Sequence, residues 1–82
     1  MDLVLLTETI IKKIVADPET VSVKSFPSED ENEMQIEVLI SSDDMGRVIG
    51  KNGKIINSIR TIVQASSSLD TNVKVKINVD SY

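Results

Sequence analysis

All three glycines of this 82-residue chain lie within residues 45–56, whose sequence is MGRVIGKNGKII. Glycine adopts backbone conformations that a side chain obstructs, so two glycines three positions apart allow a very tight turn. Gly50 can end one helix as its C-cap, and Gly53 can open the next helix. The segment therefore predicts two helices joined by residues 50–53.

The residues before this segment predict one helix followed by two strands. Apolar residues recur at helical spacing over residues 3–16, and Pro18 ends that helix. Alternating β-branched residues predict strands at residues 21–26 and 34–40. Because only the polar residues 27–32 separate these strands, we expect them to form a hairpin.

The residues that follow predict two helices and a third strand. Residues 41–44 (SSDD) form a helix start, where serine can cap free N–H groups and the acids suit the positive end of the helix dipole. That helix ends at Ile49, and the next runs from Gly53 to about residue 66, before a polar connection at residues 66–72. Residues 73–79 alternate apolar and polar side chains without interruption, which predicts a strand.

The predicted order of elements is α-β-β-α-α-β, which is typical of an α+β fold. The third strand follows a helical crossover, so it can lie parallel to the second strand, whereas the hairpin strands are antiparallel. We expect a three-stranded mixed sheet with three helices packed on one face. Residues 1–82 are expected to form this as a single domain.

The composition excludes most kinds of catalytic or metal site. The chain has no cysteine and no histidine, so it lacks disulfides, thiolate metal sites and the commonest general base. We therefore predict no enzyme activity, no cofactor and no metal. No stretch approaches the roughly 20 apolar residues of a membrane span, and the N-terminus is unlike a signal peptide, so we expect a cytoplasmic protein.

Charge is unevenly distributed along the chain. The net charge of −4 argues against a general nucleic-acid binder. Residues 45–69, however, contain four basic residues and no acid, namely Arg47, Lys51, Lys54 and Arg60. The rest of the chain has a net charge of −8, with five basic and thirteen acidic residues. If the protein binds an anion, it is expected to do so at the glycine-containing segment.

Each of the two predicted central helices has two apolar stripes. One stripe is expected to enter the core and comprises Met45, Val48, Ile55, Ile59 and Ile62. The other comprises Gly46, Ile49, Gly53, Ile56 and Arg60. This second stripe is small, apolar and bordered by cations, so it suits a groove better than a core.

The predicted turn has the properties of a phosphate-binding loop. The first N–H groups of the second helix lack internal partners and attract phosphate, and Lys51 and Lys54 add positive charge. The alternative is that the glycines only form a tight turn between helices. A Walker A loop is excluded because Ile55 follows Lys54, and the spacing of the glycines is wrong for a dinucleotide-binding fingerprint.

Residues 48–56, VIGKNGKII, resemble the KH-domain signature V-I-G-x-x-G-x-x-I. In KH domains the loop between two helices clamps the backbone of about four single-stranded nucleotides. The predicted element order resembles the type II KH arrangement, so the resemblance covers nearly the whole chain. With its sequence GRVIGKNGKIINSIRTIV, the chain is similar to the small stand-alone bacterial KhpA-like RNA-binding proteins.

This resemblance implies roles for individual residues. The implied RNA-binding residues are Gly46, Arg47, Ile49, Gly50, Lys51, Asn52, Gly53, Lys54, Ile56 and Arg60. Ile49 and Ile56 match apolar positions that contact bases, and we expect backbone groups of the second strand to read the base edges. Lys51 and Asn52 match the variable pair that faces the RNA backbone. Asn52 makes the loop less basic than a second cation would, which suggests modest affinity.

We therefore expect a single-stranded RNA-binding protein of the RNA chaperone or post-transcriptional regulator type. The alternative is a protein-interaction or dimerisation module with a KH fold, in which RNA contact is secondary. The resemblance implies a homodimer and a possible larger partner, a KhpB/Jag-like RNA-binding protein. A dimer with two short grooves gains avidity. No membrane partner is expected.

Overall fold

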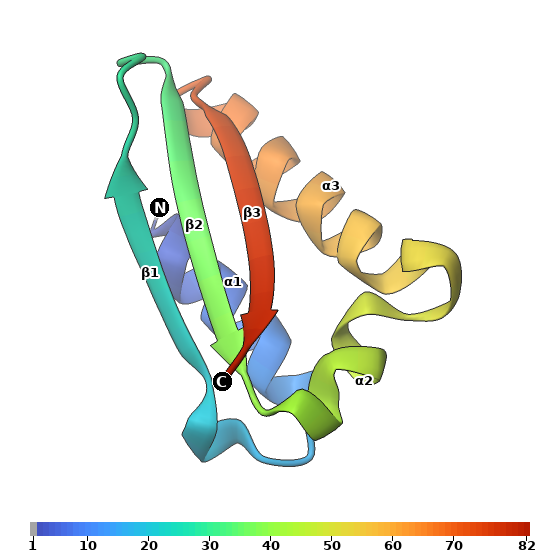
Figure 1. Cartoon of the computed structure of the whole chain (residues 1–82). Coiled ribbons are helices and arrows are strands. Elements are labelled where there is room, and N and C mark those ends of the chain that lie inside the picture. The colour runs from blue at the N-terminus through green and yellow to red at the C-terminus, as the bar shows by residue number, and fades with distance from the viewer. Residues whose placement is uncertain (1) are drawn as a thin grey trace.

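The computed structural model describes residues 2–82, whose elements follow the predicted order (Figure 1). The helices are α1 (Leu3–Ile14), α2 (Met45–Ile49) and α3 (Lys54–Asp70), and the strands are β1 (Ser22–Pro27), β2 (Glu33–Ile40) and β3 (Lys74–Ser81). Short 3-10 turns occur at Pro18–Thr20, Ser42–Asp44 and Lys51–Gly53. The α-β-β-α-α-β prediction is confirmed.

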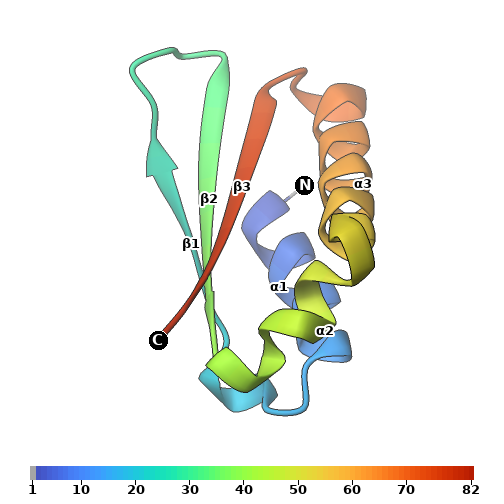
Figure 2. The same cartoon turned by 45° about the vertical axis from the view of Figure 1, so that its right-hand side comes forward.

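The three strands form one mixed sheet in the order β1-β2-β3. β1 and β2 are antiparallel, with Val23 opposite Val38, and β2 and β3 are parallel, with Ile36 opposite Ile77. Figure 2 shows the helices on one side of this sheet, with α2 near the end at which β2 and β3 terminate. The predicted mixed sheet with helices on one face is therefore confirmed, and the fold is type II KH-like.

The core between the sheet and the helices is built from aliphatic side chains. Its buried residues alternate along β2 and recur every three or four positions along α3, as one core shared by a strand and a helix requires. They are Ile36, Val38 and Ile40 in β2, and Ile56, Ile59 and Val63 in α3. Because α2 also buries Val48 in this core, the core fixes where the turn between α2 and α3 lies.

α3 is longer than its polarity suggests, since it includes residues 66–70, which were predicted to be a connection. The hydroxyl of Ser66 donates to the Ile62 carbonyl (3.1 Å), and that of Ser67 donates to the Val73 carbonyl (2.6 Å). Serine is therefore accommodated within the last turn of the helix. The helix ends where Asn72, with φ 58°, donates its N–H to the Ser67 carbonyl (2.8 Å).

Asp44 fastens the start of α2 to the loop after α1. Its side chain is 2% exposed and accepts hydrogen bonds from the N–H groups of Ala16 (2.9 Å) and Asp17 (3.3 Å). It also accepts one from the Arg47 guanidinium (3.1 Å). The predicted serine cap is wrong, because Ser41 makes no side-chain capping bond. A buried carboxylate organises this corner instead.

Acidification is expected to weaken the fold through Asp44. The Ala16 N–H is the main cause that lowers the pKa of this carboxyl; the Asp17 N–H and Arg47 act in the same direction, and burial opposes them. Such a group stabilises the fold fully above its unfolded-state pKa of about 3.9, and the effect disappears as the pH falls through the lower folded-state pKa. Urea unfolding of the wild type and Asp44→Asn is therefore expected to differ most at neutral pH. The difference should shrink below about pH 4; a constant difference at every pH contradicts this role.

Candidate nucleic-acid interface

The turn between α2 and α3 begins with a backbone conformation that is specific to glycine. Gly50 has φ 75° and ψ 174°, and a Cβ there would lie 2.7 Å from Cγ1 of Ile55. Its N–H donates to the Gly46 carbonyl (3.0 Å), which closes α2 as a C-cap does. Gly53, with φ 74° and ψ 15°, precedes the first residue of α3. Gly50 and Gly53 therefore shape the turn itself, whatever ligand it binds.

Asn52 has a conformational reason to occupy this turn. It has φ 57° and ψ 25°, in the left-handed region that asparagine tolerates better than most residues. Its side chain is exposed. Asn52 adds no positive charge to the loop, but it suits the left-handed backbone conformation at this position.

The N-terminus of α3 is open to an anionic ligand. The helix has no side-chain cap and no acidic residue in its first turn, although the N–H of its first residue, Lys54, donates to the Lys51 carbonyl within the turn. The N–H groups of this first turn carry the positive end of the helix dipole. Across the turn, a Cβ at Gly46 would meet no atom within 4 Å, which leaves open space beside α2. A phosphodiester backbone can approach this surface closely.

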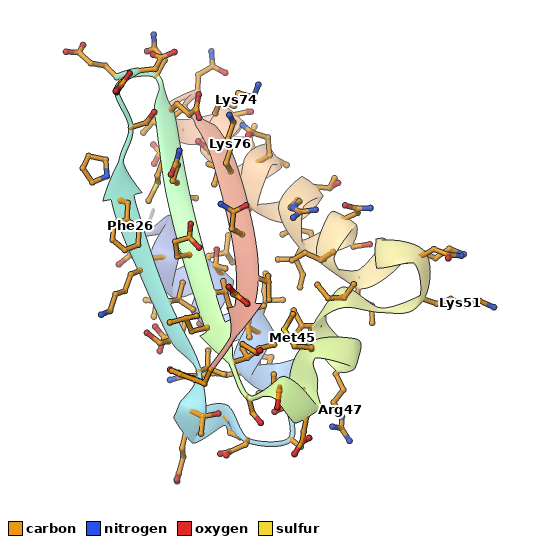
Figure 3. The ribbon with its side chains drawn as sticks, viewed as in Figure 1. Phe26, Met45, Arg47, Lys51, Lys74 and Lys76 are labelled. Carbon is orange, nitrogen blue, oxygen red and sulfur yellow. The ribbon has the colours of Figure 1, made fainter. Side chains whose placement is uncertain are left out.

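The four cations of the segment differ in their partners. Lys51 and Lys54 are exposed, and neither makes an ion pair within residues 2–82. Figure 3 shows Lys51 pointing away from the domain. Arg47 forms an ion pair with Asp44 (3.1 Å), and Arg60 donates to Oδ1 of Asn57 (3.1 Å). The two lysines are therefore available to phosphate, whereas Arg47 is partly neutralised and Arg60 is held in place.

One apolar residue of the predicted stripe is misplaced. Ile49 is half-buried at the end of α2, but Ile56 is only 3% exposed and lies in the core. Ile55 and Ile62, predicted to be core residues, are 37% and 49% exposed. Ile59, also predicted to be a core residue, is buried, so the buried face of α3 comprises Ile56, Ile59 and Val63 and lies between the two predicted stripes. The prediction that Ile56 lies on the exposed stripe is therefore wrong. Ile56 supports the turn from below, 3.9 Å from where a Cβ on Gly53 would lie.

The strand that borders this surface is β3. β2 is the central strand, so its backbone groups pair with β1 and β3, and the prediction that they read base edges is wrong. β3 is an edge strand that lies alongside α3 (Figure 1). A polar stripe on α3 consists of Asn57, Arg60 and Gln64, of which only Arg60 is a predicted site residue. Their spacing of three and four residues, just before a strand, is the signal that could have found them.

Two hollows differ in the ligands that they favour. One of about 480 Å³ lies between α3 and β3 and is lined by Arg60, Thr61, Gln64, Ala65, Ser68 and Val75. Another of about 470 Å³ lies near the turn between β1 and β2 and has four acidic lining residues, Asp2, Glu31, Glu33 and Asp70. Because repulsion disfavours an anion among the acids, the hollow beside Arg60 is the one that extends the candidate site.

Two further kinds of site are absent from the part of the chain that the structure describes. Residues 2–82 contain no group of three or more potential metal ligands close enough to hold an ion. None of their helices combines the length and the apolar character needed to cross a bilayer.

Comparison with known proteins gives consistent matches. A family profile described as "KhpA/KhpB, KH domain" matches residues 5–79. The "RNA-binding protein KhpA" of Clostridium perfringens is 39% identical over 74 residues, which cover 90% of this chain and 95% of that protein. The protein of the same name from Oceanobacillus iheyensis is 35% identical over the same shares.

Two solved structures of Era also resemble this fold. One is a point variant of Aquifex aeolicus Era bound to GDP.AlF4−, with a TM-score of 0.60 and 19% identity. The other is Era in complex with MgGDPNP and nucleotides 1506–1542 of 16S ribosomal RNA, with a TM-score of 0.60 and 20% identity. Each match covers 99% of this chain and 31% of the Era chain, so this chain spans about a third of their length. At such identities the likeness shows the fold alone.

Proposed function

The chain belongs to the KhpA/KhpB KH-domain family, and from this membership we propose that it binds single-stranded RNA and clamps the RNA backbone at residues 50–53. The relatives carry the name RNA-binding protein, which supports the coarse activity. The observation that carries the finer proposal is the acid-free turn from Gly50 to Gly53, which leads directly into the uncapped N-terminus of α3.

In this proposal the phosphates lie along the turn and the bases lie towards β3. Lys51 and Lys54 supply charge to the phosphates, with smaller contributions from the partnered Arg47 and Arg60. Asn52 faces the RNA backbone, and the absence of a side chain at Gly46 leaves space for that backbone. Ile49 offers the bases an apolar surface, and the outer edge of β3 offers them hydrogen-bonding groups. The chain has only two aromatic residues, so stacking on aromatic side chains contributes little.

Binding to labelled oligonucleotides tests this proposal directly. Fluorescence anisotropy with a mixed-sequence 12-mer RNA is expected to show binding, and a duplex of the same sequence is expected to bind more weakly. With four cations at most near the RNA, log K should fall against log salt with a slope of roughly −2 to −3, at about −0.7 per neutralised phosphate of a single strand. Preference for the duplex, or no dependence on salt, contradicts the clamp.

A second candidate function is self-association, for which an exposed apolar stripe is the specific observation. Ile55, Ile62 and Leu69 are 37%, 49% and 91% exposed and repeat every seven residues along α3. Such a stripe suits contact with another helix, and a homodimer would present two grooves to one RNA. Sedimentation at several concentrations, with and without the 12-mer, separates the two functions. A dimer that forms but binds no RNA supports a protein-interaction module.

We extend the proposal by the features that the family resemblance implies. Residues 1–82 act as one KH domain of an RNA chaperone or post-transcriptional regulator, in the cytoplasm and without a catalytic role. A larger KhpB/Jag-like RNA-binding protein is a possible partner, in keeping with a family that is described by both names.

A further inference from the structure

The outer edge of β3 presents backbone groups in a defined alternation. The N–H groups of Lys74 and Tyr82 donate to Asn32 (2.8 Å) and Ile40 (3.1 Å), so even-numbered residues of β3 face β2. The odd-numbered residues, which include Val75, Ile77 and Val79, therefore point their N–H and C=O groups outwards, alongside α3. An uncovered edge of this kind offers donors and acceptors alternately.

Side chains of α3 occupy part of this edge. Gln64 satisfies both kinds of group, because its Oε1 accepts from the Val75 N–H (2.8 Å) and its Nε2 donates to the Val73 carbonyl (3.1 Å). Arg60 acts on one kind only: its Nη2 and Nε donate to the Ile77 carbonyl at 3.0 and 3.3 Å. A third bond from Nη1 to Asn57 (3.1 Å) holds the guanidinium in this position.

Arg60 changes the chemical character of the edge beside the turn. A guanidinium has five N–H donors and no acceptor, and three of the donors are used here. Arg60 therefore covers the Ile77 carbonyl and leaves two of its own N–H donors unused. These donors lie next to the outward N–H groups of Ile77 and Val79. At Ile77 the edge of β3 therefore presents hydrogen-bond donors in place of the carbonyl acceptor that an uncovered strand would present.

We propose that Arg60 is a specificity-determining residue that makes the β3 edge select uracil and guanine, which have a keto group at C4 or C6, over cytosine and adenine, which have an amino group at that position. Uracil O4 and guanine O6 and N7 are acceptors, whereas adenine and cytosine present an exocyclic NH₂ donor on the corresponding edge. The guanidinium of Arg60 has no acceptor, so an amino base placed against it leaves its NH₂ unpaired, whereas a keto base is matched by its unused donors. This inference rests on the proposed RNA binding and adds the class of base that is preferred.

Oligonucleotide pairs test the inference without altering the fold. The wild type is expected to bind an octamer of uridine about tenfold more tightly than an octamer of adenosine, the discrimination typical of a well-placed guanidinium. Inosine replaces the adenine amino group with a keto group, so an octamer of inosine is expected to recover most of that factor. Equal affinities for the adenosine and inosine octamers overturn the inference.

Arg60→Met removes the donors while retaining an aliphatic side chain. It uncovers the Ile77 carbonyl, so the preference for uridine over adenosine and for inosine over adenosine is expected to fall to about twofold or less. Lys54→Met is the matched control, because it removes one cation from the same helix away from the β3 edge; it should weaken all octamers alike and keep the ratios. Ratios that Arg60→Met leaves unchanged overturn the inference alone. If no octamer binds the wild type, the proposed function fails and the inference fails with it.

Discussion

The double variant Lys51→Asp with Asn52→Asp is expected to lose RNA binding while remaining folded. The change alters the charge of the turn by three units, at the point where the phosphates are proposed to lie, so affinity for the 12-mer should fall by about 100-fold or more. The fold should survive because both side chains are exposed and aspartate, like asparagine, tolerates the positive φ of residue 52. Anisotropy measures the binding, and circular dichroism with thermal unfolding measures the fold.

The chain offers a closely matched control for this variant. Asn72 also has a positive φ (58°), and the exposed Lys74 follows two residues later, at the opposite end of α3. Asn72→Asp with Lys74→Asp therefore introduces the same residues and the same change of net charge away from the turn. It is expected to reduce affinity by no more than a few-fold, through long-range repulsion that added salt suppresses. Equal losses in the two double variants would falsify the location of the clamp.

Gly50→Ala is expected to destabilise the protein by about 2–4 kcal/mol, a large share of the stability of a small domain. Two costs combine at this position. The backbone of Gly50 lies in a region that other residues rarely adopt, and the new Cβ would lie 2.7 Å from Cγ1 and 2.9 Å from Cδ1 of Ile55. Urea denaturation of the variant and the wild type measures the loss of free energy.

Gly46→Ala is the natural comparison, because it makes the same chemical change four residues earlier. Its Cβ would enter open space, and the residue lies within α2, so alanine should be neutral or stabilise the fold by about 0.5–1 kcal/mol. A second test separates the two costs at Gly50. If the clash dominates, Ile55→Ala should recover part of the loss in the Gly50→Ala background, so the two effects should be non-additive. Equal stabilities of Gly50→Ala and Gly46→Ala contradict the structural role of Gly50.

The order of the elements and the position of the turn could be predicted from the sequence, because each depends on local patterns. Residues 73–79 alternate strictly, and the pair Gly50 and Gly53 marks the turn. Which face of α3 enters the core could not be predicted in this way. The predicted core stripe was Ile55, Ile59 and Ile62, whereas the buried face comprises Ile56, Ile59 and Val63, and these adjoining faces are both apolar. The rotation of α3 is set instead by the backbone of the turn and by packing on β2 and β3.

The hydrogen-bond partners of Arg60 could not be predicted from the sequence either. Its position on α3 indicated a contact with RNA, but the Ile77 carbonyl that it covers lies seventeen residues later. This bond depends on β3 being the edge strand, and strand order is a property of the whole sheet. Asp44 shows the same limit. Its acidic neighbourhood suggested a helix start, whereas two of its three hydrogen-bond donors are the N–H groups of residues 16 and 17, in the loop that follows a different helix.

The parallel pairing of β2 with β3 has a consequence for how the protein folds. Every partner pair of this ladder is separated by the same 41 positions, as Glu33 and Lys74 are, and the intervening chain contains α2, the turn and α3. Closing so long a loop costs chain entropy before any of its contacts form, so this pairing is expected late in folding. The groove between α3 and β3 has β3 as one wall, and β3 joins the sheet only through this ladder. A partly folded chain in which the β2–β3 ladder has not formed therefore lacks the groove. The proposed RNA-binding surface is expected to be either completely formed or absent.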